Sequence, residues 1–281
     1  MAGGMFVPTK NTNNPFTSSV YFTTTSDRPE KYSDIFFSAS KLAQNGQFLI
    51  RYDNSLSFDE WDEAELFKSK KNNQEKTQLF KIPRFEIYKF DPRKETFHLS
   101  TIEDLTNLFI KKQKHLIKKI IPKKLKEHFI NKFSDFELLD LRELYVNRLF
   151  FDGYLNLTYL RGAPLDIDIF VQSKKTTKLS LLEVKEKDVS KRDPKGFGMD
   201  LRRIESLTKL SKTFKVQAFY VVRHVDNQIN RNFIDWRIIE LEKFKESILS
   251  SPIIEGGFGM RSRNSSNPTK VCKIEYFSVL R

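Results

Sequence analysis

The chain has 281 residues, with 49 Lys and Arg against 36 Asp and Glu, and is long enough for one large domain or an ordinary domain with a substantial addition. A hydrophobic share of 39% with 13% aromatic residues argues against a disordered polypeptide, and the single cysteine, Cys272, excludes an internal disulfide framework and a cysteine-rich zinc site. The net charge of +13 favours a polyanionic partner, because a basic surface attracts phosphates and gains from counterion release.

The first 25 residues are rich in Thr, Ser, Asn and Gly and predict a flexible N-terminal arm. The start of the chain lacks the apolar core of a secretory signal, and no apolar run approaches the ~18 residues needed to cross a bilayer. We therefore expect a cytoplasmic protein that does not contact a membrane.

Residues 26–133 predict a mixed accessory region that contributes to recognition of the partner. The runs 47–52 and 80–90 have the composition of strands. A capping signature at Ser100 or Thr101, followed by Glu103 and Asp104, begins a helix that continues to residue 119, before Pro122 breaks it. A second helix is expected over 125–133.

Residues 134–281 predict the core domain. A helix over 136–150 precedes three strands at 154–159, 165–171 and 179–184, which suggest an antiparallel meander. A helix over 199–213 carries an apolar stripe, and strands over 216–222 and 235–241 follow. This order predicts an α/β (α+β) fold with a mixed central β-sheet flanked by helices.

Acidic residues and one lysine gather on two consecutive strands of this core. Because side chains alternate along a strand, Asp166 and Asp168 share one face, and Glu183 shares a face with Lys185. A four-residue loop at 174–177 would place Asp168 opposite Glu183 and Asp166 opposite Lys185.

Carboxylates packed so closely repel one another unless a cation lies between them, and hard oxygen ligands suit Mg²⁺. Such an ion polarises a scissile phosphate and activates water, while Lys185 beside it would position the water or neutralise charge on the phosphate. The alternative is an ordinary solvated sheet face with cross-strand ion pairs.

The core resembles the PD-(D/E)XK nucleases in the order of Pro164, then Asp166 or Asp168, then Glu183-Val184-Lys185. The resemblance covers at most residues 136–241. The resemblance implies a restriction-endonuclease-like core and DNA hydrolysis with Mg²⁺, for which Mn²⁺ can substitute. It implies that Asp168, Glu183 and the carbonyl of Val184 hold the metal, and that Lys185 is the catalytic lysine. Leu165 separates the proline from the first aspartate, so Asp166 stays a second candidate for the metal ligand.

A glutamate on the helix before the core strands reaches the metal in some members of that superfamily. Glu143, or failing that Glu137, is the corresponding candidate here, and the alternative is a helix glutamate that faces solvent.

Basic residues flank the predicted site and are candidates for contacts with DNA. The loop and helix after the second acidic strand contribute Lys187, Lys195, Arg202 and Arg203, and a glycine-rich loop contributes Arg261, Arg263 and Asn264. That glycine-rich loop lacks the lysine of a P-loop, so we expect no nucleotide cofactor. The alternative for both groups is ordinary solvated charge.

Together these features predict a Mg²⁺-dependent endonuclease that acts on double-stranded DNA. The accessory region and the basic loop favour a sequence-specific type II restriction endonuclease, as a homodimer that cuts both strands of a symmetric site. The alternatives are a repair, recombination or phage nuclease with structural preference, and a non-catalytic DNA-binding protein.

Overall fold

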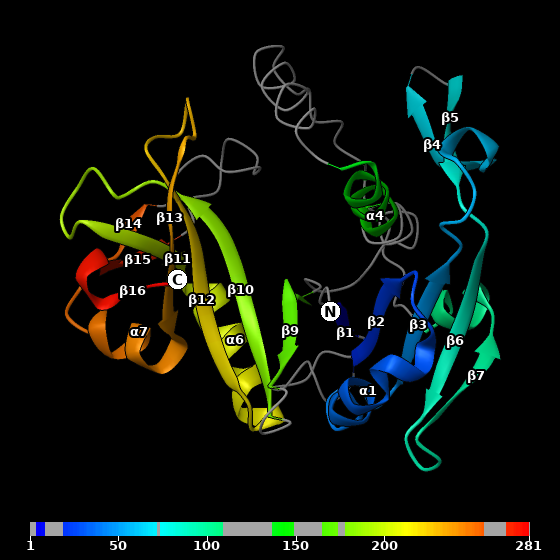
Figure 1. The fold of residues 1–281 in the computed structure, drawn as a ribbon, viewed down its shortest axis with the longest axis horizontal. Coiled ribbons are helices and arrows are strands. Elements are labelled where there is room, and N and C mark those ends of the chain that lie inside the picture. The colour runs from blue at the N-terminus through cyan, green and yellow to red at the C-terminus, as the bar shows by residue number, and fades with distance from the viewer. Residues whose placement is uncertain are drawn as a thin grey trace. The chain divides into compact units, whose positions relative to one another are not determined.

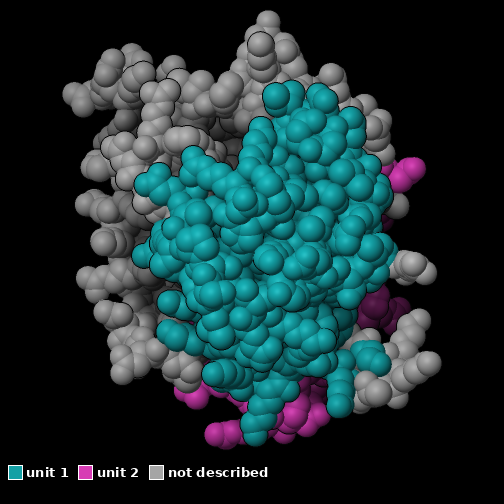
Figure 2. All heavy atoms as spheres, turned by 90° about the vertical axis from the view of Figure 1, so that its left-hand side faces the viewer, with its two compact units in different colours: residues 1–3, 165–281 teal, residues 4–164 magenta. Residues whose placement is uncertain are grey.

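The computed structural model describes residues 4–8, 19–71, 74–108, 137–148, 165–173, 178–255 and 268–280. These residues form two compact units, one within residues 4–164 and one within 165–281 (Figure 1; the second unit is teal in Figure 2). Both units combine helices with strands, which confirms a mixed α+β class. The boundary follows residue 164, so the helix predicted over 136–150 belongs to the first unit.

The first unit consists mainly of strands. Its strands are β1 (Met5–Pro8), β2 (Ser19–Thr25), β3 (Gly46–Tyr52), β4 (Asp62–Lys71), β5 (Gln74–Ile82), β6 (Phe85–Asp91) and β7 (Thr96–Ser100). Its helices are η1 (Pro29–Tyr32), α1 (Ser33–Ser40), η2 (Phe58–Glu60), α2 (Ile102–Thr106) and α4 (Leu138–Arg148). The strands β7-β6-β3-β2-β1 lie side by side in that order, and β4 and β5 form a separate hairpin.

Strand β2 corrects the prediction of a flexible arm over residues 1–25. Every residue of β2 is buried, because β1 and β3 pair with its two edges and apolar layers cover both faces of the sheet. One face includes Val20 and Phe22 in a cluster with Trp61. On the other face the ring of Tyr21 contacts that of Phe36 from α1. Residues 1–3 and 9–18 of the predicted arm lie outside the described residues.

The strands and the helix N-cap predicted for this unit are largely present in the structure. The run 47–52 lies in β3, but the run 80–90 is divided between β5 and β6 by Pro83 and Arg84. Thr101 caps α2 and accepts a hydrogen bond from the backbone N–H of Asp104 at 3.1 Å, which confirms the capping signature. The helix expected to continue to residue 119 is shorter in the structure, where α2 ends at Thr106. The helix expected over 136–150 is α4, and residues 109–136 lie outside the described residues.

The second unit holds the acidic strands. Its strands are β8 (Leu165–Asp166), β9 (Ile169–Gln172), β10 (Leu179–Lys187), β11 (Gly196–Asp200), β12 (Gln217–Val225), β13 (Phe233–Glu240), β14 (Ile254–Glu255), β15 (Pro268–Lys273) and β16 (Ser278–Val279). Its helices are α6 (Leu201–Phe214), α7 (Leu241–Ser247) and η4 (Ile274–Tyr276).

The main sheet of this unit is mixed, with strand order β16-β13-β12-β10-β9. Strands β10 and β12 are parallel and the connection between them includes α6, whereas the other neighbours are antiparallel. The predicted stripe of α6 is buried through Ile204, Leu207 and Leu210, on the same side of the sheet as Tyr220 of β12 and Phe244 of α7. Glu183 of β10 points to the same side of the sheet, because it is opposite Tyr220 and pairs with Arg203 of α6.

Two predictions for the core need correction. The strand expected over 165–171 is broken at Ile167 and Asp168, which separate β8 from β9. The helix expected from residue 199 begins at Leu201, because β11 comes first and pairs with β15 in a second, smaller sheet. The strand expected over 154–159 lies outside the described residues.

Within the described ranges, none of the helices combines the length and the apolar character needed to cross a bilayer.

Candidate active site

The hairpin of β9 and β10 brings Asp168 next to Glu183. The paired residues end with Ile169 opposite Leu182, and one further step in the same register places Asp168 opposite Glu183. This is the register expected from a four-residue loop at 174–177, and it is confirmed although the loop itself lies outside the described residues.

Asp168 is fixed by the strand that it faces. It lies in the break between β8 and β9, and its Oδ2 accepts a hydrogen bond from the backbone N–H of Val184 at 2.8 Å. The same oxygen is 3.2 Å from Nζ of Lys185, in a site where the Asp168 side chain is 26% exposed. The carboxylate therefore points at β10 and keeps partial contact with solvent.

Glu183 is the most deeply buried charged group of the site, with 1% of its side chain exposed. Its Oε1 lies 2.8 Å from Nζ of Lys185, and its Oε2 forms an ion pair with Arg203. Burial raises the pKa of Glu183 above its ordinary value, although the charges of Arg203 and Lys185 oppose that rise. The carboxylate thus depends on nearby cations to stay ionised.

Lys185 lies between the two acidic residues and is 42% exposed. Burial acts to lower the pKa of its ammonium, but the carboxylates of Glu183 and Asp168 outweigh that effect and raise the pKa. A cation therefore occupies the space that the two carboxylates share.

The structure places Arg203 and Asp166 differently from the sequence-based expectation. Arg203 donates to Oδ1 of Asp166 at 3.0 Å and to the main-chain carbonyl of Asp166 at 2.7 Å, besides its ion pair with Glu183. The predicted contact of Asp166 with Lys185 is replaced by this one, because the break after β8 ends the ladder. Arg203 is 15% exposed, and the structure places it in the acidic site and not on an exposed basic surface.

The donor set fits a hard divalent cation such as Mg²⁺ in chemical type. Asp168 and Glu183 supply carboxylate oxygens, and the carbonyl of Val184, the residue between Glu183 and Lys185, is the candidate for a third donor. Oε1 of Glu183 is buried and has the Lys185 ammonium at 2.8 Å as its partner, so a bound cation would take the place of that ammonium. Among the described residues, no group of three or more His, Cys, Asp and Glu side chains has the placement of a metal site, so two carboxylates are the acidic contribution here.

The other predicted residues lie on several different elements. Glu143, the helix candidate, is exposed on α4 of the first unit. Burial raises the pKa of Tyr52 in that unit, and the charge of Glu143 adds to this rise. Arg202 is exposed on α6, and Lys187 ends β10. Arg261, Arg263, Asn264 and the neighbouring glycines lie outside the described residues, as does Pro164.

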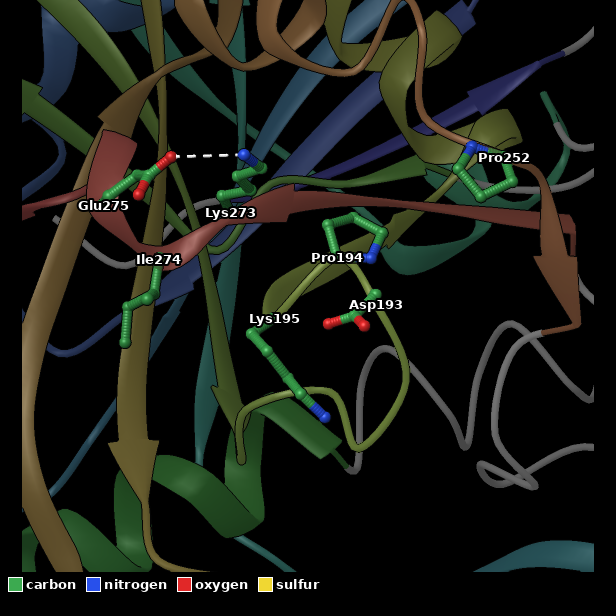
Figure 3. A pocket seen from close by; sticks show the side chains of 7 residues that line it. All are labelled: Asp193, Pro194, Lys195, Pro252, Lys273, Ile274 and Glu275. Carbon is green, nitrogen blue, oxygen red and sulfur yellow. Dashed lines mark ion pairs between the residues drawn. The ribbon is translucent and has the colours of Figure 1, made fainter.

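Lys195 belongs to a separate pocket of about 620 Å³ in the second unit (Figure 3). The pocket is lined by Asp193, Pro194, Lys195, Pro252, Lys273, Ile274 and Glu275. The Lys273 ammonium pairs with Glu275 at 3.4 Å, and Figure 3 shows the Lys195 side chain extending away from that pair. None of the residues around Glu183 lines this pocket.

The role of Arg203 was present in the sequence but was missed. Arg203 precedes Leu207 by four residues and Leu210 by seven, so it lies on the buried side of α6. Arg202 has no such spacing to the apolar stripe and is exposed. An arginine in register with a buried stripe predicts a buried anionic partner, which here is Glu183.

No family model matches this chain, and no curated protein or solved structure is significantly similar to it.

Proposed function

We propose that this protein is a Mg²⁺-dependent endonuclease that hydrolyses DNA phosphodiester bonds at Asp168, Glu183 and Lys185. The observation that carries the proposal is the convergence of the two carboxylates on one position, now taken by the Lys185 ammonium at 3.2 and 2.8 Å. A solvated sheet face with ordinary ion pairs does not require a glutamate that is 1% exposed. The burial of Glu183 therefore favours a site over a surface.

Each residue has a role that follows from its position. Asp168 and Glu183, with the carbonyl of Val184, would hold Mg²⁺, which when bound polarises the phosphate and activates water. The hydrogen bond from the Val184 N–H orients the Asp168 carboxylate. Lys185 is exposed enough to reach a bound phosphate, where its ammonium would offset the negative charge that develops during attack.

The proposed substrate is double-stranded DNA, in keeping with the net charge of +13. The narrower proposal is a sequence-specific type II restriction endonuclease that acts as a homodimer, since two sites related by a two-fold axis cut both strands of a symmetric sequence. This narrower step rests on the resemblance of residues 164–185 to the PD-(D/E)XK nucleases.

The test is incubation of long duplex DNA with the protein in Mg²⁺ and in EDTA, beside Lys185→Ala and a control, Lys209→Ala. Lys209 is exposed on α6. Wild type and Lys209→Ala are expected to cut in Mg²⁺ only, while Lys185→Ala binds the DNA but does not cut it. Discrete fragments support the sequence-specific enzyme, and a smear supports a repair, recombination or phage nuclease. Binding without cleavage by the wild type would overturn the catalytic proposal and leave a DNA-binding protein.

A further inference from the structure

Two aromatic side chains lie exposed side by side near the turn that joins β12 to β13. Phe233 is 50% exposed and Trp236 is 38% exposed, and their ring centroids are 6.1 Å apart. Ile234 beside them is 51% exposed. Large apolar side chains grouped on a protein surface commonly mark a binding site.

A β-bulge places the two rings on one face. Residues an odd number apart on a regular strand point to opposite faces, so Phe233 and Trp236 would ordinarily be separated. The pairing of β12 with β13 shifts here, since His224 is opposite Asp235 whereas Val225 is opposite Phe233, which makes Ile234 the extra residue. Bulges re-aim side chains and are frequent beside functional sites.

An arginine completes this surface. The guanidinium of Arg223 lies 5.2 Å from the centroid of the Phe233 ring, within range of a cation–π interaction. Arg223 is held by Glu186 at 2.7 Å, and Arg231 forms an ion pair with the same carboxylate. Two guanidinium groups therefore flank one carboxylate next to the rings.

The surface of Arg223, Phe233 and Trp236 lies on the sheet that carries the acidic site. Trp236 is opposite Arg223, and Arg223 is opposite Glu186, which follows Lys185 on β10. Because successive residues point to opposite faces, these rings and the Lys185 ammonium lie on the two faces of the same end of the parallel strands.

We propose that this surface binds unpaired nucleobases of a single-stranded nucleic acid. Exposed aromatic rings offer faces on which bases stack, and arginine adds cation–π contacts with the bases and charge for the phosphates. A duplex keeps its bases stacked inside, where these rings do not reach them. The partner is thus a strand with unpaired bases, which goes beyond the cleavage proposed above and does not depend on it.

The test uses the intrinsic fluorescence of the full chain, which contains two tryptophans. Trp61 is 3% exposed in the first unit, so quenching on addition of a single-stranded oligothymidylate in EDTA reports on Trp236. The quenching is expected to saturate, to persist in Trp61→Phe and to disappear in Trp236→Phe. An oligothymidylate is the probe because it has no stable secondary structure, and EDTA prevents cleavage.

Affinity is measured separately by the anisotropy of a labelled oligothymidylate. Trp236→Ala and Phe233→Ala are each expected to weaken binding by about 5- to 150-fold, the equivalent of 1–3 kcal/mol of stacking. Trp236→Phe, which keeps a ring, is expected to retain most of the affinity. Leu249→Ala is the control, because Leu249 is 79% exposed elsewhere in the same unit.

Three results would overturn the proposal. The first is unchanged oligothymidylate affinity in Trp236→Ala. The second is a loss of affinity in Trp236→Ala that is larger for duplex DNA than for oligothymidylate. The third is loss of self-association of the protein in Trp236→Ala without loss of nucleic-acid binding. The last result would assign the surface to a second copy of the chain. A failure of cleavage in Mg²⁺ leaves the outcome of this test unaffected.

Discussion

Replacing Arg203 with Met is expected to destabilise the second unit by about 3 kcal/mol, because it removes a cation from a buried carboxylate. Arg203 is 15% exposed and its partner Glu183 is 1% exposed. Methionine keeps much of the length and the apolar stem of arginine, so the loss reports mainly on charge.

The magnitude follows from what remains after the substitution. Breaking a buried ion pair by removing one partner costs about 3–5 kcal/mol. Lys185 stays 2.8 Å from Oε1 of Glu183 and offsets part of that cost, so the lower end of the range applies. The pair Lys245–Glu242 is a control, with side chains 28% and 52% exposed, and Lys245→Met is expected to cost no more than about 1 kcal/mol.

The loss should also depend on pH in a defined direction. Burial raises the pKa of Glu183, and without Arg203 the pKa rises further. When the pKa of a carboxyl is higher in the folded state than in the unfolded state, its ionisation destabilises the folded state. This destabilisation is complete at pH values above the folded-state pKa, and it fades as the pH falls toward the unfolded-state pKa. The difference in unfolding free energy between Arg203→Met and wild type is therefore expected to be larger at pH 8 than at pH 5.

The assay is urea unfolding followed by the fluorescence of Trp236, in a Trp61→Phe background so that the signal comes from the second unit. Adding Glu183→Gln to Arg203→Met removes the uncompensated charge and should recover part of the stability. A loss below about 1 kcal/mol for Arg203→Met, equal at both pH values, would refute the buried ion pair.

Three further predictions concern the same unit. Asp166→Asn keeps an oxygen that can accept a hydrogen bond from Arg203, so this variant should retain DNA cleavage. Asp168→Asn should slow cleavage by about 100-fold or more. Equal cleavage rates in the two variants would exclude Asp168 as the metal ligand. Burial raises the pKa of the Cys272 thiol, so its alkylation should be slow in the native protein and fast in urea, and fast native labelling would contradict its burial. Gly196→Ala should lower the free energy of unfolding by about 2 kcal/mol, because the new Cβ would lie 1.8 Å from the carbonyl oxygen of Cys272. The measurement is a urea titration, and an unchanged midpoint would show that β11 and β15 can move apart without loss of stability.

The register of the acidic hairpin could be predicted because it depends on local rules. Side chains alternate along strands, and a loop with an even number of residues keeps Asp168 and Glu183 on one face. The apolar stripe of α6 and the Thr101 cap are likewise periodic or local signals, and the structure confirms both.

The features that the sequence did not reveal depend on contacts between distant segments. The break at Ile167 and Asp168 is one such feature, and the pairing of Arg203 with Glu183, 20 residues apart in sequence, is another. Residues 19–25 are rich in Val, Tyr, Phe and Thr, which favour strands, so β2 could have been predicted if it had been separated from the Asn- and Gly-rich residues before it. The bulge at Ile234 leaves no compositional signal and follows from strand pairing alone.

The most direct test of the account is the binding of Mn²⁺, followed by its paramagnetic resonance signal in titrations of the full chain. Wild type is expected to bind the ion, Asp168→Asn and Glu183→Gln are expected to lose that binding, and Lys209→Ala is expected to match wild type. Wild-type protein that binds no Mn²⁺, or binding that survives in both carboxylate variants, would contradict the claim that Asp168 and Glu183 share a divalent cation.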